Sequence, residues 1–303
     1  RKFRNAEPAR DREVVRFQET AVFVAEHRRV ALALYGRFSL ALNIKPMDYQ
    51  EAAQFYPTFS NEDKVRLYSV FGGIPFYNRL ISKQLSVKEN IIELIASPGA
   101  RLENEVSMYL NSELSKIINA NEVFEQLAVG VSKFSDLLNK SHISSSPALS
   151  EALKKLMQMD MVAKEAPIND KNNKKRAGYY IQDNLARFYY RYVFRYSSQL
   201  RIMNSDLFYD TYIARDFEEQ YVHKRFEDIC RQFLIKKNIQ GEMDIPFEDI
   251  GILYHKTHRP GTVLAPAGAH RLDRRLHVNR RRLMTEPRIL PLGELTGPRQ
   301  DLL

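Results

Sequence analysis

Closely spaced helix boundaries restrict residues 48–95 to a series of short helices. Two patterns of a serine followed three residues later by an acidic residue have the spacing of a capping box, in which each side chain binds the backbone N–H group of the other residue. A Gly-Gly pair ends the first of these helices. A proline then opens the next helix without the loss of a hydrogen bond, because the first N–H groups of a helix have no partner inside it. The capping pairs are Ser60 with Asp63 and Ser86 with Glu89, and the breaks lie at Gly72, Gly73 and Pro75.

Residues 119–181 show a different pattern, in which three predicted helices precede two predicted strands. The third helix opens at Ser146 and Pro147, and its apolar residues recur at i, i+3, i+4, i+7 and i+8, so that they line one face. The polar sequence NDKNNKK joins the two strands. Three helices and a lysine-tipped hairpin predict a winged helix-turn-helix. The apolar positions of the third helix are Leu149, Ala152, Leu153, Leu156 and Met157.

The basic residues of this unit suggest a contact with DNA. In a winged helix-turn-helix the third helix can enter a major groove while the wing touches phosphates. Against this, the helix offers few side chains that read bases, and a neutral domain forms weaker non-specific contacts than a basic one. Such domains also serve as protein-interaction or spacer modules, in which the wing lysines are a solvated turn. The candidate DNA-binding residues are Lys154, Lys155, Lys171, Lys174, Lys175 and Arg176.

Two further helices are predicted beyond the hairpin, over residues 183–200 and 216–238. The first interleaves aromatic residues with arginine, a pattern that can bind single-stranded nucleic acid by stacking. Its helical spacing instead favours a helix that is packed between domains. The second helix is amphipathic. Its predicted buried face consists of Phe217, Tyr221, Phe226, Ile229 and Phe233.

The net charge of +9 comes from the two ends of the chain. Between residues 35 and 251, 16 lysines and 12 arginines balance 28 acidic residues. The ends, residues 1–34 and 252–303, carry arginine rather than lysine, and the second is also rich in proline and glycine without a sustained helix or strand period. We therefore predict that both ends are disordered or unrelated to the fold. A basic arm that binds nucleic acid is the alternative.

Composition narrows the remaining classes of protein. Hydrophobic residues make up 44% of the chain, which is enough for packed cores. No run of about 18 uncharged apolar residues occurs, and the charged sequence RKFRNAEPARDREVVRF lacks the apolar centre of a secretory signal. These features predict a cytoplasmic protein without membrane contact. The single cysteine, Cys230, excludes an intrachain disulfide and a zinc site made of paired cysteines, and a buried apolar role is expected for it.

Several sequence blocks between residues 35 and 251 occur in an order that is typical of one family. The blocks are LNIKPMDYQEAAQFYP, FGGIPFY, GYYIQDNLARFYYRYV and FEEQYVHKRFEDIC, followed by FEDIG. In these blocks the chain resembles the C-terminal two-thirds of the archaeal-type AAA ATPases, which have a P-loop domain, a helical lid, a winged helix and a restriction-endonuclease-like domain. The resemblance implies a mainly α fold. Its parts are a helical lid over residues 35–118, a winged helix-turn-helix with a small β-hairpin wing and a linker helix over residues 119–200, and a truncated α/β nuclease-like piece over residues 201–251.

The resemblance also implies one wall of an adenine site. The family lid carries a Gly-x-Pro element that lies against the adenine base, and Gly73, Ile74 and Pro75 match this element. A glycine lets the backbone approach the base, and the flat proline ring packs on a purine face. Taken alone, Gly-Gly-x-Pro is a helix stop and restart. Arg37 is a candidate phosphate contact, and its alternative role is that of a surface residue.

Neither catalytic centre of the family is complete in this sequence. A P-loop needs a glycine followed by a lysine to hold the phosphates, and none of the twelve glycines is followed by lysine. A restriction-type nuclease needs several carboxylates and a lysine around magnesium. Glu227 matches the family's opening acidic residue, but no Glu-x-Lys follows it. We expect no catalytic residue, no metal site and no ATP turnover from this chain alone, whereas the intact family uses ATP with Mg²⁺.

The sequence therefore predicts a fragment of an ATP-binding AAA-type ATPase, in which lid and winged helix change conformation with the nucleotide. Two alternatives stay open. One is a non-enzymatic winged-helix protein that binds double-stranded DNA, and the other is a protein-interaction module that needs neither ligand. Apolar surface left by the missing sheets predicts self-association.

Overall fold

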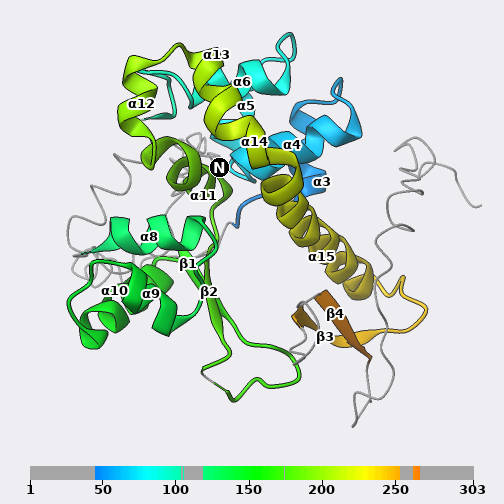
Figure 1. Cartoon of the computed structure of the whole chain (residues 1–303). Coiled ribbons are helices and arrows are strands. Elements are labelled where there is room, and N and C mark those ends of the chain that lie inside the picture. Colours follow the sequence, from blue (N-terminus) through cyan, green and yellow to red (C-terminus); the bar gives the residue numbers. More distant parts are fainter. Residues whose placement is uncertain (1–44, 104, 106–118, 174, 253–261, 267–303) are drawn as a thin grey trace, which may run out of the picture.

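Helices dominate the computed structural model of this chain (Figure 1). In the part of the chain that the structure describes, the sheets are two antiparallel hairpins. No described helix combines the length and the apolar character needed to cross a bilayer. The described residues are 45–103, 105, 119–173, 175–252 and 262–266.

The first part of the fold, here called the helical unit, comprises residues 45–103 and has the predicted caps. The Ser60 hydroxyl accepts the N–H of Asp63 at 3.1 Å. Ser86 and Glu89 form a complete capping box, since each side chain accepts the backbone N–H of the other residue, at 3.2 and 2.7 Å. Both predicted helix starts are confirmed. The elements are α3 (Tyr49–Ala52), the 3-10 turn η1 (Ala53–Phe55), α4 (Asn61–Phe71), α5 (Pro75–Leu80) and α6 (Val87–Leu94).

The second part, here called the hairpin unit, comprises residues 119–181. Its third helix buries the predicted apolar face, with Leu149 and Leu156 fully buried. The strands pair antiparallel, with Val162 opposite Ile181 and Glu165 opposite Gly178. Three helices followed by a two-stranded hairpin are therefore present as predicted. They are α8 (Ala120–Ala128), α9 (Phe134–Lys140), α10 (Ser146–Gln158), β1 (Val162–Glu165) and β2 (Gly178–Ile181).

Residues 184–239 differ from the two simple helices that the sequence predicts. The first predicted helix contains a π-helical segment and is followed by α12, and the second belongs to a longer helical run over residues 205–239 that contains two more π segments. Each π turn holds one extra residue, which single-sequence periodicity at 3.6 does not reveal. The elements are α11 (Asn184–Phe188), η2 (Tyr189–Phe194), α12 (Ser197–Ile202), α13 (Ser205–Phe208), η3 (Tyr209–Ile213), α14 (Ala214–Asp216), η4 (Phe217–Val222) and α15 (His223–Ile239).

A second hairpin follows α15. Strand β3 (Phe247–Ile252) pairs antiparallel with β4 (Thr262–Pro266), with Ile250 opposite Leu264. Strand β4 lies within the tail 252–303, for which the sequence predicts mostly disorder. That prediction is wrong for these five residues, because so short a strand does not stand out in a Pro/Gly-rich context. The predicted N-terminal segment 1–34, Arg37 and Lys174 lie outside the described residues.

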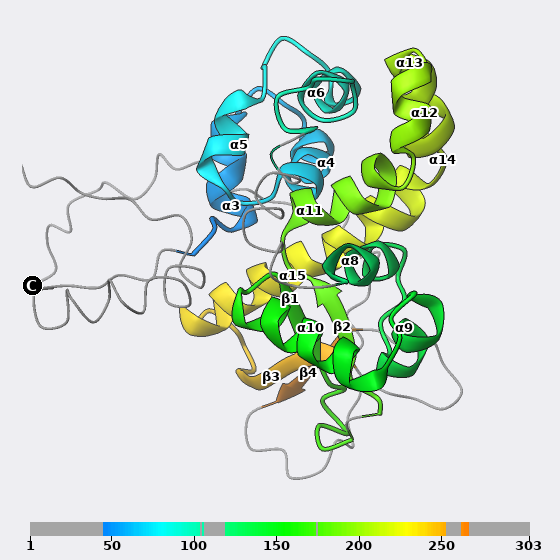
Figure 2. The same ribbon diagram turned by 90° about the vertical axis from the view of Figure 1, so that its left-hand side faces the viewer.

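One continuous hydrophobic core joins the helical unit, the hairpin unit and the helices between them. Its central ring is Phe188 of α11, which is fully buried. The ring centroid of Phe188 lies 5.0 Å from that of Tyr192, 6.3 Å from that of Phe217 and 5.7 Å from that of Tyr221. The aromatic helix is therefore packed in the interior, as its spacing predicts. Figure 2 shows α15 running between the helical unit and the hairpin unit.

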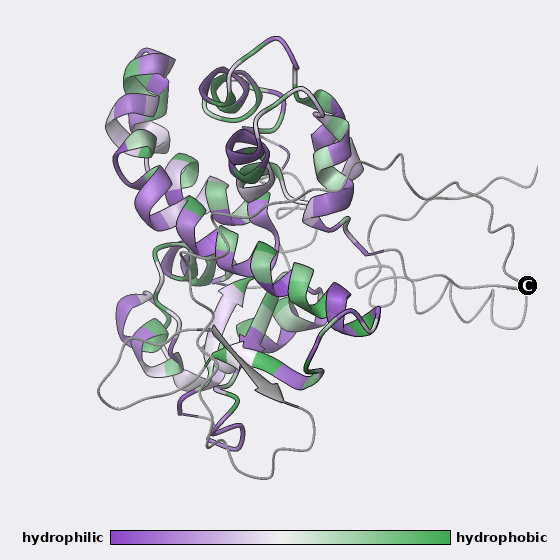
Figure 3. Ribbon diagram, turned by 90° about the vertical axis from the view of Figure 1, so that its right-hand side faces the viewer, coloured by the Kyte–Doolittle hydropathy of each residue, from purple (hydrophilic) through white to green (hydrophobic). Residues whose placement is uncertain are grey.

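The far end of α15 is more exposed than the sequence predicts. Phe233 is expected on the buried face but is 40% exposed, and Ile239 is 79% exposed. Near this end, Gln232 binds Tyr68 and Lys236 pairs with Asp48 of the helical unit. Apolar residues nevertheless remain exposed toward the end of the helix, and in Figure 3 the ribbon of α15 has green, hydrophobic stretches among purple, hydrophilic ones.

The turn after α4 requires a residue without a side chain, Gly73. A Cβ atom at Gly73 would lie 1.9 Å from the carbonyl oxygen of Met47, and the Met47 N–H donates to the Gly73 carbonyl at 2.9 Å. The backbone of Met47 therefore crosses directly over Gly73. Any side chain at this position would push the two backbone segments apart.

We predict that Gly73→Ala lowers the free energy of unfolding by about 3 kcal/mol or more, because the colliding atoms belong to the backbone and cannot rotate away. Gly99→Ala is the control. Its φ is +78° with nothing within 4 Å of an added Cβ, so it should cost only about 1–2 kcal/mol of backbone strain. Urea unfolding of both variants measures the difference, and equal losses would contradict the close approach.

Candidate functional site

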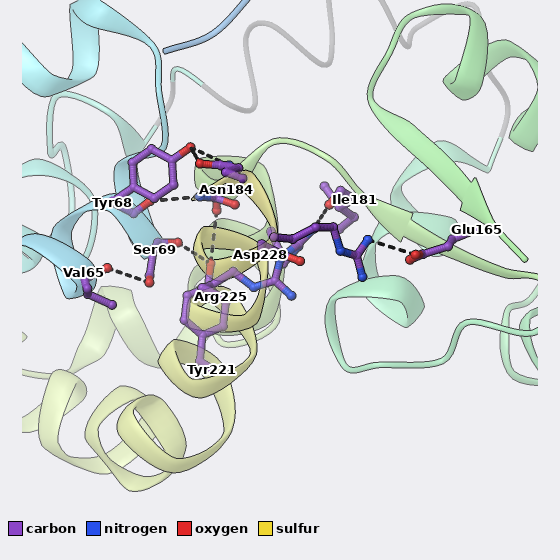
Figure 4. Close-up of polar contacts among 12 residues, drawn as sticks. Val65, Tyr68, Ser69, Glu165, Ile181, Asn184, Tyr221, Arg225 and Asp228 are labelled. Atoms are coloured by element: carbon purple, nitrogen blue, oxygen red, sulfur yellow. Dashed lines mark hydrogen bonds and ion pairs between the residues drawn. The ribbon is translucent and has the colours of Figure 1, made fainter. Parts of the chain in front are cut away.

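The candidate functional site is a polar junction where α4, α11, α15 and β1 meet (Figure 4). Its contacts join segments that are up to 188 residues apart in the chain. Because the groups are partly or wholly buried, each unmade hydrogen bond would carry a desolvation cost. The junction therefore fixes how the helical unit, the hairpin unit and the long helical run sit against one another.

Asn184 and Tyr221 make the centre of this junction. The Asn184 side-chain amide donates to the Tyr68 carbonyl of α4 at 2.9 Å. The Tyr221 hydroxyl lies 3.1 Å from the Ser69 carbonyl and 3.2 Å from the Asn184 carbonyl, so its single proton is shared between two acceptors. Burial raises the pKa of Tyr221 well above its ordinary value. The phenol therefore stays neutral at physiological pH and acts as a donor that joins α4, α11 and η4.

Helix α15 is tied to the start of the helical unit by a second group of contacts. The Gln232 side-chain N–H donates to the Tyr68 hydroxyl at 3.1 Å, and its carbonyl oxygen accepts the N–H of Tyr49 at 3.1 Å. One turn further on, Lys236 pairs with Asp48 at 3.0 Å. These contacts hold α15 against the segment that enters the helical unit.

The opposite side of α15 binds the hairpin unit. Arg231 pairs with Glu165 at the end of β1 at 2.9 Å, and both side chains are about one-fifth exposed. Burial raises the pKa of the Glu165 carboxyl, and the Arg231 guanidinium opposes that shift. Arg187 of α11 lies 3.7 Å from Asp228 of α15 and also donates to the Ile181 carbonyl. Helix α15 thus contacts both units through charged or polar side chains.

The start of α11 carries a partly buried acid, Asp183. The Asp183 carboxylate caps this helix and accepts the N–H of Ala186 at 2.6 Å. Burial raises the pKa of Asp183, and the backbone N–H groups of Ala186 and Leu185 oppose the shift. The role of this acid is thus to place Asn184, the next residue, against α4.

The predicted adenine-contact residues lie at one edge of this junction. Gly73 is buried under Met47, whereas Pro75 is exposed at the first turn of α5 and Phe76 beside it is 37% exposed. A Cβ atom at the neighbouring Gly72 would lie 3.3 Å from Cβ of Asn184. The Gly72–Gly73 turn is therefore held from both sides. A shallow groove of about 820 Å³ opens nearby and is lined by Lys45, Met47, Glu51, Gln54, Phe55 and Lys83.

The predicted DNA-binding residues do not form one group. On α10, Lys154 is exposed, whereas Lys155 pairs with Glu151 at 2.9 Å. On the loop between β1 and β2, Lys171 pairs with Asp249 of β3 at 2.5 Å, and Arg176 pairs with Asp170. Lys175 is exposed. The basic residues of this loop thus lie near the second hairpin and at a distance from the lysines of α10.

The described residues offer neither a cluster of metal-binding side chains nor a reactive thiol. Among the described residues no group of three His, Cys, Asp or Glu side chains could hold a metal ion. Cys230 is half-buried on α15, and burial raises the pKa of its thiol to about 11, so the nucleophilic thiolate is scarce at neutral pH.

Comparisons with known proteins find a matching family model and a relative, and neither carries an assigned activity. A family described as archaeal and bacterial proteins of unknown function matches residues 189–260. The chain is also similar to an uncharacterized protein of Methanocaldococcus jannaschii, with 28% identity over 223 residues that cover 74% of this chain and 49% of the relative. The chain therefore spans about half the length of this relative. No solved structure matches the chain.

We predict that Tyr221→Phe lowers the free energy of unfolding by about 1–3 kcal/mol, because two buried carbonyl groups lose their shared donor. Tyr212→Phe is the matched control from the same helical run. Its ring stacks with those of Tyr196 and Phe208, and these contacts survive the substitution. Urea unfolding compares the two variants, and a loss no larger at Tyr221 than at Tyr212 would show that the hydroxyl does not stabilise the junction.

Proposed function

We propose that residues 45–252 are the coupling part of an AAA-type ATPase, in which a helical lid passes the state of a nucleotide to a winged helix-turn-helix. In this proposal the helical unit is the lid and the hairpin unit is the winged helix. The long helical run with strand β3 is the opening of the nuclease-like piece. The nucleotide core precedes the lid in the intact family, and the relative's greater length leaves room for one.

The observation that carries the proposal is the double restraint on the Gly72–Gly73 turn. The Met47 backbone, which enters the helical unit, lies on Gly73, and the Asn184 side chain lies on Gly72. A displacement of the entering segment therefore moves the turn, and the turn moves α11. The same Asn184 binds the last turn of α4 through Tyr68, so both routes converge on one residue.

Helix α15 supplies the second half of the coupling. Gln232 and Lys236 attach it to Tyr49 and Asp48 of the lid, and Arg231 attaches it to Glu165 of the hairpin unit. A rigid helix with contacts at both units transmits a rotation or shift from one to the other. In this proposal the nucleotide starts the movement. Its adenine lies against Pro75 and Phe76, and the core holds its magnesium-bound phosphates.

A non-hydrolysable ATP analogue with Mg²⁺ should affect this chain and the longer protein of Methanocaldococcus jannaschii differently. In the relative, amide hydrogen exchange should slow together in the two segments that align with residues 68–74 and 184–187, because both segments border one turn. In this chain alone, neither segment should respond and no ATP should be hydrolysed. Mass spectrometry of peptides from both proteins, with and without the analogue, measures the effect.

Two results would contradict the coupling proposal. One is ATP turnover by this chain when it is purified to a single species. The other is slower exchange in only one of the two segments of the relative, because the geometry of Asn184 couples them. AMP without magnesium is the control ligand, since it offers the base without the phosphates that bind the core.

Duplex DNA binding is a second candidate function, favoured by the exposure of Lys154 on the third helix of the hairpin unit. An α10 lysine on the outer face is placed to reach a phosphate when the helix enters a groove. The described middle of the chain supplies few such contacts, and its charges balance. The expected binding is therefore weak and strongly dependent on salt.

A DNA titration at about 50 and 200 mM salt tests this second candidate by fluorescence anisotropy. Wild-type chain should lose affinity steeply between the two concentrations, because each phosphate contact releases bound counterions. Lys154→Gln should weaken binding at the lower concentration, whereas Lys64→Gln, a lysine of the helical unit, should not. A single weak affinity at both salt concentrations would rule out a specific role of α10.

A further inference from the structure

The loop between β1 and β2 does not project into solvent as a free wing. The Ile168 N–H donates to the Ile252 carbonyl of β3 at 2.9 Å. The Lys171 ammonium lies 2.5 Å from the Asp249 carboxylate of the same strand. One backbone bond and one ion pair thus dock the loop on β3, on the far side of α15 from the lid.

Gly251 makes this docking possible. A Cβ atom at Gly251 would lie 2.6 Å from Cγ2 of Ile168, closer than real Cβ atoms approach. The backbone of Gly251 is extended in β3 and pairs opposite Val263, so the conformation itself tolerates a side chain. The glycine is therefore required for the fit of Ile168 and not for the shape of the strand.

The position of β3 is set by α15. The Asn238 side chain binds both backbone groups of Phe247, accepting its N–H at 3.0 Å and donating to its carbonyl at 2.9 Å. Strand β3 consequently follows α15, whose other contacts reach Tyr68 and Asp48 of the helical unit. A shift of α15 against the hairpin unit would carry β3 away from the loop.

The loop is basic and meets an acidic side chain. Its sequence over residues 169–176, NDKNNKKR, has four basic residues and one acid, Asp170, which pairs with Arg176. Asp249 thus provides a carboxylate where a nucleic-acid phosphate would meet Lys171. The Lys171 side chain is 63% exposed, so its ion pair with Asp249 is solvated and contributes little to stability.

We propose that β3 is an internal cover for the loop between β1 and β2, and that it competes with double-stranded DNA for the basic surface of that loop. This inference rests on the second candidate function, DNA binding by the hairpin unit. In the structure the cover is closed. Its release frees the Lys171 ammonium from Asp249, so that it can contact a phosphate beside Lys175, and adds the loop to the contact that α10 makes.

Three variants of the full chain separate the parts of the cover. Asp249→Asn removes the ion pair and leaves the strand backbone intact. Gly251→Ala places a methyl group against Ile168 and displaces the loop. The double variant Ile168→Ala with Gly251→Ala restores space and should close the cover again. Asp244→Asn, at an exposed aspartate before β3, is the control for the change in net charge.

The test uses a fluorescein-labelled DNA duplex of about 20 base pairs and fluorescence anisotropy over a series of salt concentrations. Asp249→Asn and Gly251→Ala should bind the duplex about threefold or more tightly than wild type at low salt. Their slope of log affinity against log salt should be steeper by about one, because Lys171 gains a phosphate. Asp244→Asn and the double variant should behave as wild type. Hydrogen exchange of residues 166–173 should be faster in Gly251→Ala.

Three other outcomes would contradict the proposal that β3 covers the loop, and each also bears on DNA binding by the hairpin unit. If loop amides in Gly251→Ala exchange no faster than in wild type, β3 is a fixed support and not a cover. If the loop opens but affinity does not rise while Lys154→Gln still weakens binding, the hairpin unit binds DNA without the wing. If neither wild type nor any variant binds the duplex, both the cover and the DNA candidate are wrong.

Discussion

The buried hydroxyl of Tyr221 is the interaction on which the arrangement of this protein depends. A phenol taken out of water must find acceptors, and here the two acceptors belong to α4 and to the start of α11. The ring of the same residue packs on Phe188 and Phe217, so its polar and apolar requirements are met by one relative position of three helices. Tight packing of this kind does not deform continuously, which is the property that the proposed coupling needs.

Local features of the fold were predictable because their causes lie within a few residues. The N-cap at Ser60, the capping box at Ser86, the break at Gly72 and the two strands of the first hairpin all follow from short-range hydrogen bonding and periodicity. The π segments were not predictable, since apolar spacing at a period of 3.6 does not show where an extra residue enters a helix. The exposure of Phe233 was missed for a related reason. Amphipathic spacing shows which face of a helix is apolar but not how far along the helix a partner extends.

The candidate site illustrates the limit of sequence reasoning more sharply. The family resemblance predicts that Gly73 lets the backbone approach an adenine base, but the sequence could not identify Met47 as the neighbour that the structure places on it. Asn184, Gln232 and Arg231 carry the contacts between units, and nothing in their local sequence marks them, because their partners are more than 60 residues away. The lysines of the loop between β1 and β2 were predicted to bind DNA or to form a solvated turn, whereas the acid that meets Lys171, Asp249, lies on a strand from a different part of the chain.

The π turns of the long helical run determine which side chains meet which unit. An α-helix advances about 100° per residue, so each extra residue in a π turn rotates everything that follows by roughly that angle. The segments η3 and η4 both precede α15, and together they set the phase at which Gln232 points toward the helical unit and Arg231 toward the hairpin unit. An uninterrupted α-helix of the same sequence would present different residues at these two interfaces. The identity of the contacting residues is thus encoded in the winding of the backbone upstream as much as in the side chains themselves.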